Sequence, residues 1–321
     1  MYFYIKEHLG RGIALLMSFF VAQSAYFSFG YFNKPMYGNA HKVSILLALV
    51  FTYVIVLILP HLKDKKIRDG FVLIFIINVI WTTLAGMGIT NYYGFDYNRS
   101  VTASVLSLMF PVCLYYLKGR HKYILALLTF NAILWTKASA GLGGFIGASF
   151  AYTWMRVSKL WSMVALSIGV GISYLVYGKD LLEPSGRLWA WENLYLKQGL
   201  VALREKGWFG FGFGISPSYM NILQQKYNIR NGSEIFWWAH NDLLQMFLEC
   251  GPIIVVYISI LYLFYLLRAY KNSCVYSVMF LISYGVNSLT NFPHHHATGI
   301  ICVIMGLLLV NEENKFKKEI L

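Results

Sequence analysis

The stretch NDLLQMFLECGPIIVVYISILYLFYLL, residues 241–267, contains an apolar run long enough to cross a lipid bilayer as a helix, which takes roughly 20 residues. Its first third carries four polar residues, Asn241, Asp242, Gln245 and Glu249. Asn241 suits an N-cap and Asp242 suits the first turn, so the sequence predicts a helix that begins near residue 241. At about 100° per residue, Asp242, Gln245 and Glu249 share one face, and the apolar side chains face the other way.

Gly251 and Pro252 follow this polar stripe directly. Proline removes a helix hydrogen bond, which predicts a kink. Glu249 would then lie about two turns inside the helix, where an ionisable side chain is costly unless it has a partner or faces water. We expect the stripe to border a water-filled cavity. The alternative is that Gln245 and Glu249 bond neighbouring helices.

The composition of the whole chain indicates an integral membrane protein. Of 321 residues, 58% are hydrophobic and 13% are charged, with a mean hydropathy of +0.54, whereas soluble proteins average about 25% charged residues. No segment alternates with the period of two that a barrel strand requires. We therefore predict an all-α polytopic membrane protein with about ten transmembrane helices. These are expected at residues 12–31, 43–60, 71–89, 101–117, 123–136, 140–155, 160–177, 243–267, 274–290 and 297–311. The fifth and sixth are short, so a re-entrant pair is an alternative there.

Lys and Arg predict the orientation, because cytoplasmic loops hold an excess of them. With the N-terminus inside, sixteen fall in cytoplasmic segments and four in the short outer loops, so both termini are expected in the cytoplasm. Contact with anionic lipid is sufficient to explain the net charge of +13, without nucleic acid. Residues 178–239 then form one long outer loop within a single membrane domain, 1–321. Long ordered loops often carry function.

Two stretches of this outer loop suit phosphate binding. In SGRLWAWENLYL, residues 185–196, Arg187 offers a planar fork of donors that matches a diphosphate. The alternative is an arginine that reaches to lipid headgroups. In GWFGFGFGISP, residues 207–217, Gly212 and Gly214 permit a close backbone approach and contact with phosphate.

Other outer-surface residues are candidates for the same site. His240 lies at the junction of the outer loop and the kinked helix, which favours catalysis over a merely interfacial role. Arg99, in NYYGFDYNRS, is an outer cation that touches substrate or anchors the interface among tyrosines. His294 would contact phosphate or sugar. Because three adjacent histidines do not converge on one ion, and the four cysteines stand singly, we expect neither a metal site nor a disulfide.

The order of these motifs resembles the bacterial O-antigen ligase and O-antigen polymerase family. Arg187 with Trp191, then GWFGFGFG, then HNDLLQMFLECG and then NFPHHH follow one another as they do in that family. The segment TKASAGLGG, residues 136–144, resembles the family's Thr/Ser-Arg-Ala/Gly segment. The resemblance covers roughly residues 135–300.

This resemblance implies a glycosyltransferase at the periplasmic face of the bacterial inner membrane. Such enzymes transfer a glycan from undecaprenyl diphosphate to a hydroxyl group, on lipid A–core in the ligases and on a lipid-linked glycan in the polymerases, with no metal or cofactor. In the family, two arginines bind the diphosphate and a histidine serves catalysis. Arg187 and His240 match the second arginine and the histidine, and Lys137 stands near the place of the first arginine. Lysine supplies charge without the bidentate fork.

The residue types suit this chemistry independently. Fixed cations at Arg187 and Lys137 would stabilise the leaving diphosphate, and His240 would accept a proton from the acceptor hydroxyl or orient it. Asn241, Gln245 and Glu249 would bind substrate. We expect an inverting O-antigen ligase with lipid A–core as acceptor, and the alternative is a polymerase. The alternative from another class is a transporter or flippase of lipid-linked glycans, which paired broken helices would favour.

Overall fold

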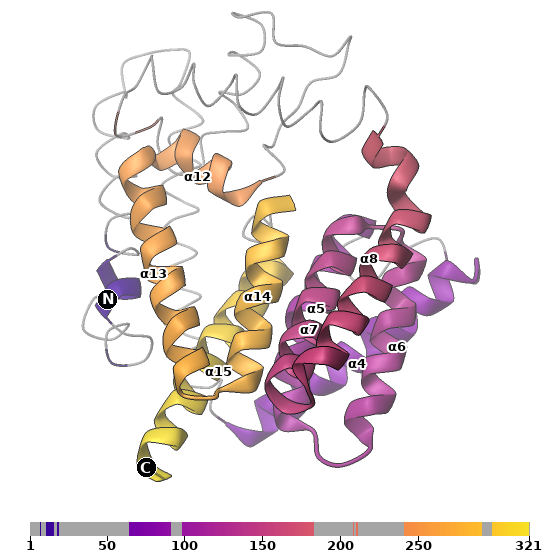
Figure 1. Cartoon of the computed structure of the whole chain (residues 1–321), viewed down its shortest axis with the longest axis horizontal. Coiled ribbons are helices and arrows are strands. Elements are labelled where there is room, and N and C mark those ends of the chain that lie inside the picture. The colour runs from indigo at the N-terminus through magenta and orange to yellow at the C-terminus, as the bar shows by residue number, and fades with distance from the viewer. Residues whose placement is uncertain are drawn as a thin grey trace, which may run out of the picture. The chain divides into compact units, whose positions relative to one another are not determined.

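The computed structural model describes residues 7, 11–15, 18, 64–90, 98–182, 208, 210, 241–290 and 297–320. Every regular element among these residues is an α-helix, which confirms the all-α prediction (Figure 1). The chain divides into two compact units, Met1–Pro60 with Asp180–Leu261, and His61–Lys179 with Tyr262–Leu321. We refer to them as unit 1 and unit 2 and describe each by itself.

The described helices follow the predicted spans closely. The span predicted at 43–60 lies outside the described residues, and the span at 12–31 lies largely outside them. From residue 64 onward, each predicted span corresponds to one helix, with the exception of 243–267. The helices are α4 (Lys65–Gly86), α5 (Arg99–Tyr116), α6 (His121–Thr136), α7 (Ser139–Arg156), α8 (Lys159–Leu182), α12 (Asp242–Cys250), α13 (Pro252–Lys271), α14 (Val275–Thr290) and α15 (Ala297–Ile320).

The prediction of one kinked helix over 243–267 was wrong, because the chain forms two helices there. Gly251 has φ 80° and ψ 172°, which ends α12 at Cys250. Its backbone N–H donates to the Phe247 carbonyl at 2.9 Å. Pro252 is then the first residue of α13, a position where proline's missing N–H costs nothing. Figure 1 shows α12 turned away from the direction of α13.

Close packing of α5 against α7 forms the centre of unit 2. A Cβ on Gly141 would lie 2.4 Å from the Ala103 Cβ, and a Cβ on Gly144 would lie 3.0 Å from the Ser107 Oγ. These pairs differ by 38 and 37 in residue number, an almost constant offset, so the two helices run parallel. Figure 1 shows them side by side. Glycine permits this approach because it has no side chain.

Helix α14 runs antiparallel to both α5 and α7. Tyr276, near its start, contacts the ring of Tyr115 near the end of α5 and the ring of Tyr152 near the end of α7. Asn287, near its end, lies against Gly144 near the start of α7. We call the end of unit 2 where α5 and α7 begin the Lys137 end, and the opposite end the Tyr276 end.

Unit 2 has an apolar exterior and a partly polar interior. Leu73 of α4, Leu127 of α6 and Leu175 of α8 are 58%, 71% and 84% exposed. By contrast, Thr129 and Ser277 are completely buried. By length and composition, two of the described helices, α4 and α13, are apolar enough to cross a membrane, so the ten-span topology stays a prediction.

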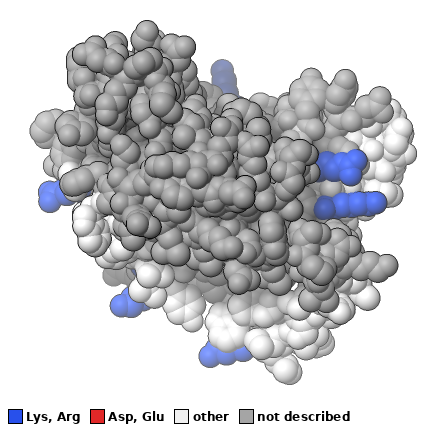
Figure 2. Space-filling view, turned by 90° about the horizontal axis from the view of Figure 1, so that it is seen from above, with Lys and Arg blue, Asp and Glu red and all other residues white. Residues whose placement is uncertain are grey.

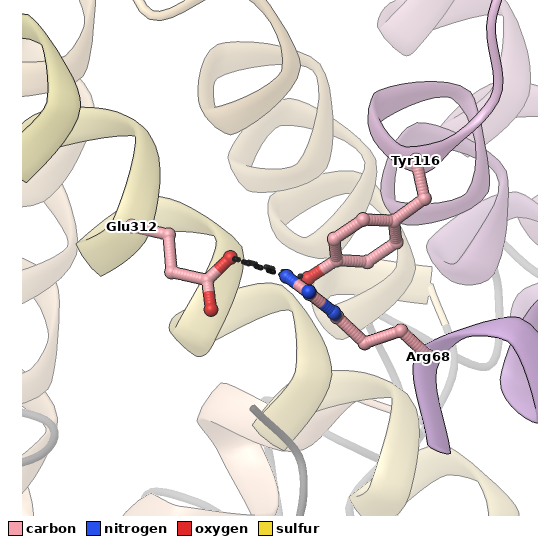
Figure 3. Close-up of polar contacts among 3 residues, drawn as sticks. All are labelled: Arg68, Tyr116 and Glu312. Atoms are coloured by element: carbon pink, nitrogen blue, oxygen red, sulfur yellow. Dashed lines mark hydrogen bonds and ion pairs between the residues drawn. The ribbon is translucent and has the colours of Figure 1, made fainter. Parts of the chain in front are cut away.

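At the Tyr276 end, Glu312 of α15 joins three helices (Figure 3). Its carboxylate lies 3.8 Å from the Arg68 guanidinium of α4. It also accepts a hydrogen bond from the Tyr116 hydroxyl of α5 at 3.4 Å. The Arg68 guanidinium lies over the Tyr116 ring, 5.1 Å from its centroid. The C-terminal part of α15 therefore fixes the ends of α4 and α5.

The next residue, Glu313, caps the start of α14. Its carboxylate accepts hydrogen bonds from the Ser277 N–H at 2.8 Å and from the Ser277 hydroxyl at 2.7 Å. Glu313 lies beyond the predicted span 297–311. Burial raises the pKa of Glu313 above its ordinary value of 4.5, and the bonds from Ser277 partly oppose that rise. A negative charge at a helix N-terminus is stabilised by the helix dipole, so this contact orders the turn between α13 and α14.

Candidate functional site

The structure describes five of the ten predicted site residues. Asn241, Gln245 and Glu249 belong to unit 1, and Arg99 and Lys137 belong to unit 2. The other five lie outside the described residues, and their roles stay predictions. They are Arg187, Gly212, Gly214, His240 and His294.

In unit 1, α12 begins as the sequence predicts. The Asn241 Oδ1 accepts a hydrogen bond from the Leu244 N–H at 3.0 Å, which confirms the predicted N-cap. Gln245 and Glu249 are each 1% exposed, and the Gln245 Nε2 donates to the Glu249 Oε1 at 2.8 Å. The polar stripe therefore faces inward and its members bond one another along the helix. Contrary to expectation, these side chains do not border an open cavity.

The backbone of Gly210 lies directly against the end of α12. A Cβ on Gly210 would lie 2.6 Å from both the carbonyl carbon and the oxygen of Glu249, and 2.7 Å from the Cys250 nitrogen. Gly210 is buried and has φ 66°, a conformation that other residues rarely adopt. Gly210 of the Gly-rich segment and Glu249 of the HNDLLQMFLECG motif, which are 39 residues apart in the sequence, are thus in contact. The sequence predicted a close backbone approach in this segment but not its partner.

In unit 2, Arg99 and Lys137 stand at the same end of the parallel pair α5 and α7. Arg99 is the first residue of α5, and Lys137 lies two residues before Ser139, the first residue of α7. Their residue numbers differ by 38, as do those of Ala103 and Gly141, which are in contact. The two cations therefore lie at the same level, about one turn beyond that contact. Both are exposed.

A short ordered turn holds Lys137. Its φ of 53° and ψ of 33° are left-handed, which ends α6. The Thr136 Oγ1 donates to the Ile133 carbonyl at 2.7 Å and accepts from the Ala138 N–H at 3.2 Å. No side chain caps the first turn of α7. A lysine in a sparsely populated conformation beside a helix N-terminus is the kind of strain that accumulates at functional sites.

A buried polar cluster lies beneath these cations, and the sequence reasoning missed it. The Asn287 Nδ2 donates to the Ser107 Oγ and to the Ser283 carbonyl, both at 2.8 Å, and the Ser283 Oγ donates to the Ser107 carbonyl at 3.0 Å. All three residues are completely buried. The signal in the sequence was the pair Ser283 and Asn287, four residues apart in an apolar helix, which places them on one face.

The electrostatics of the described part are basic but dispersed. Figure 2 shows Lys and Arg side chains at separate places along the margin of one view, and no Asp or Glu of the described residues is visible in it. No three His, Cys, Asp or Glu side chains of the described ranges are grouped to hold a metal. The four cysteines are buried and free in this structure.

Comparison with known proteins gave no relative that assigns this site. No protein-family model matches the sequence, and no curated protein matches it.

Proposed function

We propose that this protein is a membrane glycosyltransferase that moves a glycan from undecaprenyl diphosphate to a hydroxyl group at the periplasmic face of the bacterial inner membrane. The observation that carries the proposal is the placement of Arg99 and Lys137 at one end of two parallel helices. The proposal is also supported by the order of the sequence motifs, in which Arg187 and His240 lie on either side of the Gly-rich segment.

The exposed apolar side chains support a membrane location. Soluble monomers rarely expose large contiguous apolar surfaces, whereas α4, α6 and α8 each expose several large apolar residues. Burial of Ser and Asn side chains between the helices fits the same environment, where small and polar residues join helices. Up to ten spans with both termini in the cytoplasm and an outer loop at 178–239 belong to this proposal.

Two cations at one level suit a diphosphate. Each phosphate of the donor carries negative charge, and the departing group gains more as its bond to the sugar breaks. Arg99 and Lys137 would face this charge together with the uncapped N-terminus of α7, since helix N-termini favour anions. Arg187 would add the bidentate contact that lysine does not make. Positive groups that are already fixed in place stabilise such a leaving group with little reorganisation.

The transfer itself needs one proton acceptor. The acceptor oxygen attacks the anomeric carbon, the bond from that carbon to the diphosphate oxygen breaks, and undecaprenyl diphosphate leaves with the electron pair. His240 takes the hydroxyl proton or orients the hydroxyl, and the configuration at the anomeric carbon inverts. Asn241, Gln245 and Glu249 are assigned to the acceptor side, because they lie within nine residues after His240.

We infer lipid A–core as the acceptor, which makes the protein an O-antigen ligase, and a polymerase that extends a lipid-linked glycan is the alternative. A flippase would bind the same donor with the same cations, but it would leave the glycan on its lipid. The break at Gly251 supplies one broken helix among the described residues, whereas transporters pair two.

Complementation of a deletion strain tests the assignment. His240→Ala and Arg187→Ala should each abolish glycan display, while the protein stays in the membrane at the level of the wild type. A flippase would instead lose translocation, with donor accumulating on the cytoplasmic side. Normal display by either alanine variant would refute the site, and the Ser273→Ala variant, altered in the turn between α13 and α14, serves as the control.

A further inference from the structure

Three buried oxygen atoms in unit 2 have no hydrogen-bond partner among the described residues. They are the Oδ1 of Asn78 and the hydroxyl oxygens of Thr82 in α4 and Thr129 in α6. The exposed fraction is 1% for Asn78 and zero for both threonines. In native proteins the large majority of buried side-chain polar atoms bond to protein or to ordered water, because an unpaired one costs free energy. A ligand that bonds to these three oxygens would remove that cost.

The hydroxyls of Thr82 and Thr129 do not bond to the carbonyl one turn earlier in their own helices, as threonine hydroxyls in helices commonly do. Thr83, the next residue of α4, follows the common pattern, since its Oγ1 donates to the Val79 carbonyl at 2.9 Å. Thr153 of α7 donates in the same way to the carbonyl four residues earlier, at 3.1 Å. The protons of the two buried hydroxyls are therefore available to an acceptor in the interior.

Helices α4 and α6 run in the same direction. Arg68 near the start of α4 lies over the ring of Tyr116 at the end of α5, so α4 is antiparallel to α5. Phe130 of α6 stacks on Phe145 of α7, each seven residues from the turn that joins these helices, so α6 is antiparallel to α7. Because α5 and α7 are parallel, α4 and α6 are parallel as well.

The three oxygens lie close to one level of this parallel pair. Gly86 of α4 lies against Trp135 of α6, because a Cβ on Gly86 would overlap the indole ring, and the two residue numbers differ by 49. With the same offset, Thr129 stands midway between the levels of Asn78 and Thr82, within about 3 Å of each along the axis. Asn78 and Thr82 are four residues apart and share one face of α4. One small ligand between the helices can therefore bond to all three side chains.

We propose that one ordered water molecule binds between α4 and α6 and bonds to Asn78, Thr82 and Thr129. Water accepts from both threonine hydroxyls and donates to the Asn78 Oδ1, and about three bonds are typical of a buried water. A sodium ion would leave both hydroxyl protons without an acceptor. The water links α4 to α6, the helix that ends one residue before Lys137.

Valine variants test the site, because valine resembles threonine in shape and lacks the hydroxyl. Thr82→Val and Thr129→Val should each lower the unfolding temperature in detergent, by about 2–4 °C, since each removes a donor to the water. If the two hydroxyls were unpaired in the protein, their removal would instead eliminate a buried unpaired group and raise the unfolding temperature. A rise, or no change, in either variant would overturn the proposal.

A double-mutant cycle tests whether both hydroxyls bond to the same water. Once Thr129→Val is present, Thr82→Val should lower the unfolding temperature much less than it does alone, since residues that share a partner are not additive. Thr83→Val is the matched control, because the Thr83 hydroxyl bonds to its own helix, and its effect should add fully to that of Thr129→Val. Full additivity of Thr82→Val and Thr129→Val would overturn the shared site.

Two further measurements identify the ligand. The wild type should unfold at the same temperature in sodium chloride and in choline chloride of equal concentration, whereas stabilisation by sodium that Thr82→Val abolishes would assign the site to a cation and overturn the proposal. A high-resolution crystal structure of the full chain should show a density peak about 2.8 Å from the three oxygens. Bonds from these oxygens to protein groups, with no peak between them, would also overturn it. These measurements require no transfer activity, so their outcome is separate from that of the proposed function.

Discussion

Gly141 of α7 lies against the backbone of Ala103 in α5, and this contact sets Arg99 and Lys137 at one level. A Cβ on Gly141 would stand 2.5 Å from the Ala103 carbonyl carbon and oxygen. The relationship between the two cations is therefore a consequence of helix packing, because the offset between α5 and α7 is fixed by a glycine four residues after Lys137.

The first prediction is that Gly141→Ala destabilises the protein and weakens donor use together. Overpacking costs roughly 1–3 kcal/mol, and separation of α5 from α7 moves one cation away from the other. Gly143→Ala is the matched control in the same helix, because a Cβ there would meet only the Val286 Cγ1, at 3.2 Å. Thermal unfolding in detergent and the KM for the donor measure both effects. If both variants had the same unfolding temperature and the same donor KM, the contact at Gly141 would not set the offset between α5 and α7.

The second prediction separates the charge of Lys137 from its strained backbone. Asparagine tolerates the left-handed conformation, so Lys137→Asn should leave the unfolding temperature unchanged or raise it. A lost charge-assisted bond of roughly 1.5–3 kcal/mol should raise the donor KM about 10- to 100-fold. Lys137→Arg should retain activity. Ser273→Asn, at the other described non-glycine position with φ 53°, should change neither quantity. Full activity of Lys137→Asn would show that Lys137 does not bind the donor.

The third prediction concerns pH. Because burial holds the pKa of Glu313 above its ordinary 4.5, the folded state binds this proton more tightly than the unfolded state does. Stability from this group is then complete below pH 4.5 and declines as the pH rises through the raised pKa. The slope is at most about 1.4 kcal/mol per pH unit.

Glu313→Gln tests the pH prediction, because glutamine still accepts a bond from Ser277 but does not titrate. The wild type should lose stability, measured as unfolding temperature, relative to this variant as the pH rises above 4.5 through the raised pKa of Glu313. Glu313→Ala should destabilise at every pH, since two bonds from Ser277 are lost. If the wild type gained stability as Glu313 ionises, the pKa of Glu313 would be lowered in the folded state and not raised, which would contradict this prediction.

The fourth prediction separates ligase from polymerase. Deletion of a ligase leaves full-length polymer on undecaprenyl diphosphate and bare lipid A–core. Deletion of a polymerase leaves lipid A–core with a single repeat unit. We expect the first pattern on silver-stained lipopolysaccharide gels. A single-repeat band would mean that the acceptor is a lipid-linked glycan and not lipid A–core. The proposed donor chemistry of Arg187 and Lys137 would be unaffected.

Local signals in the sequence predicted the helices well, because apolar runs bounded by charged turns mark where a helix begins and ends. The N-cap at Asn241 could be predicted for the same reason, because its signal lies in the residues next to it. The break at Gly251 was misread because Pro252 fits both a kink and the first turn of a new helix. The choice depends on the conformation of Gly251, which the residue type permits but does not impose.

Contacts between distant segments were beyond sequence reasoning. Ser107 and Asn287 are 180 residues apart, and neither residue shows which helix covers it. The same holds for Glu313 and Ser277, and for Gly210 and Glu249. The level shared by Arg99 and Lys137 depends on the register of two parallel helices, which are joined only through α6. The type of a residue indicates which chemistry its side chain can perform. Only the fold shows which other residues lie beside that side chain.

Purified protein in liposomes that contain glycan-linked undecaprenyl diphosphate and lipid A–core gives the most direct test of the transferase activity. The wild type should release undecaprenyl diphosphate in equal amount to the glycan joined to the acceptor, and release should require the acceptor. His240→Ala and Lys137→Asn should each reduce both products together. Glycan that crosses the bilayer while it remains on its lipid, with no release of undecaprenyl diphosphate, would show that the protein is a flippase and not a glycosyltransferase.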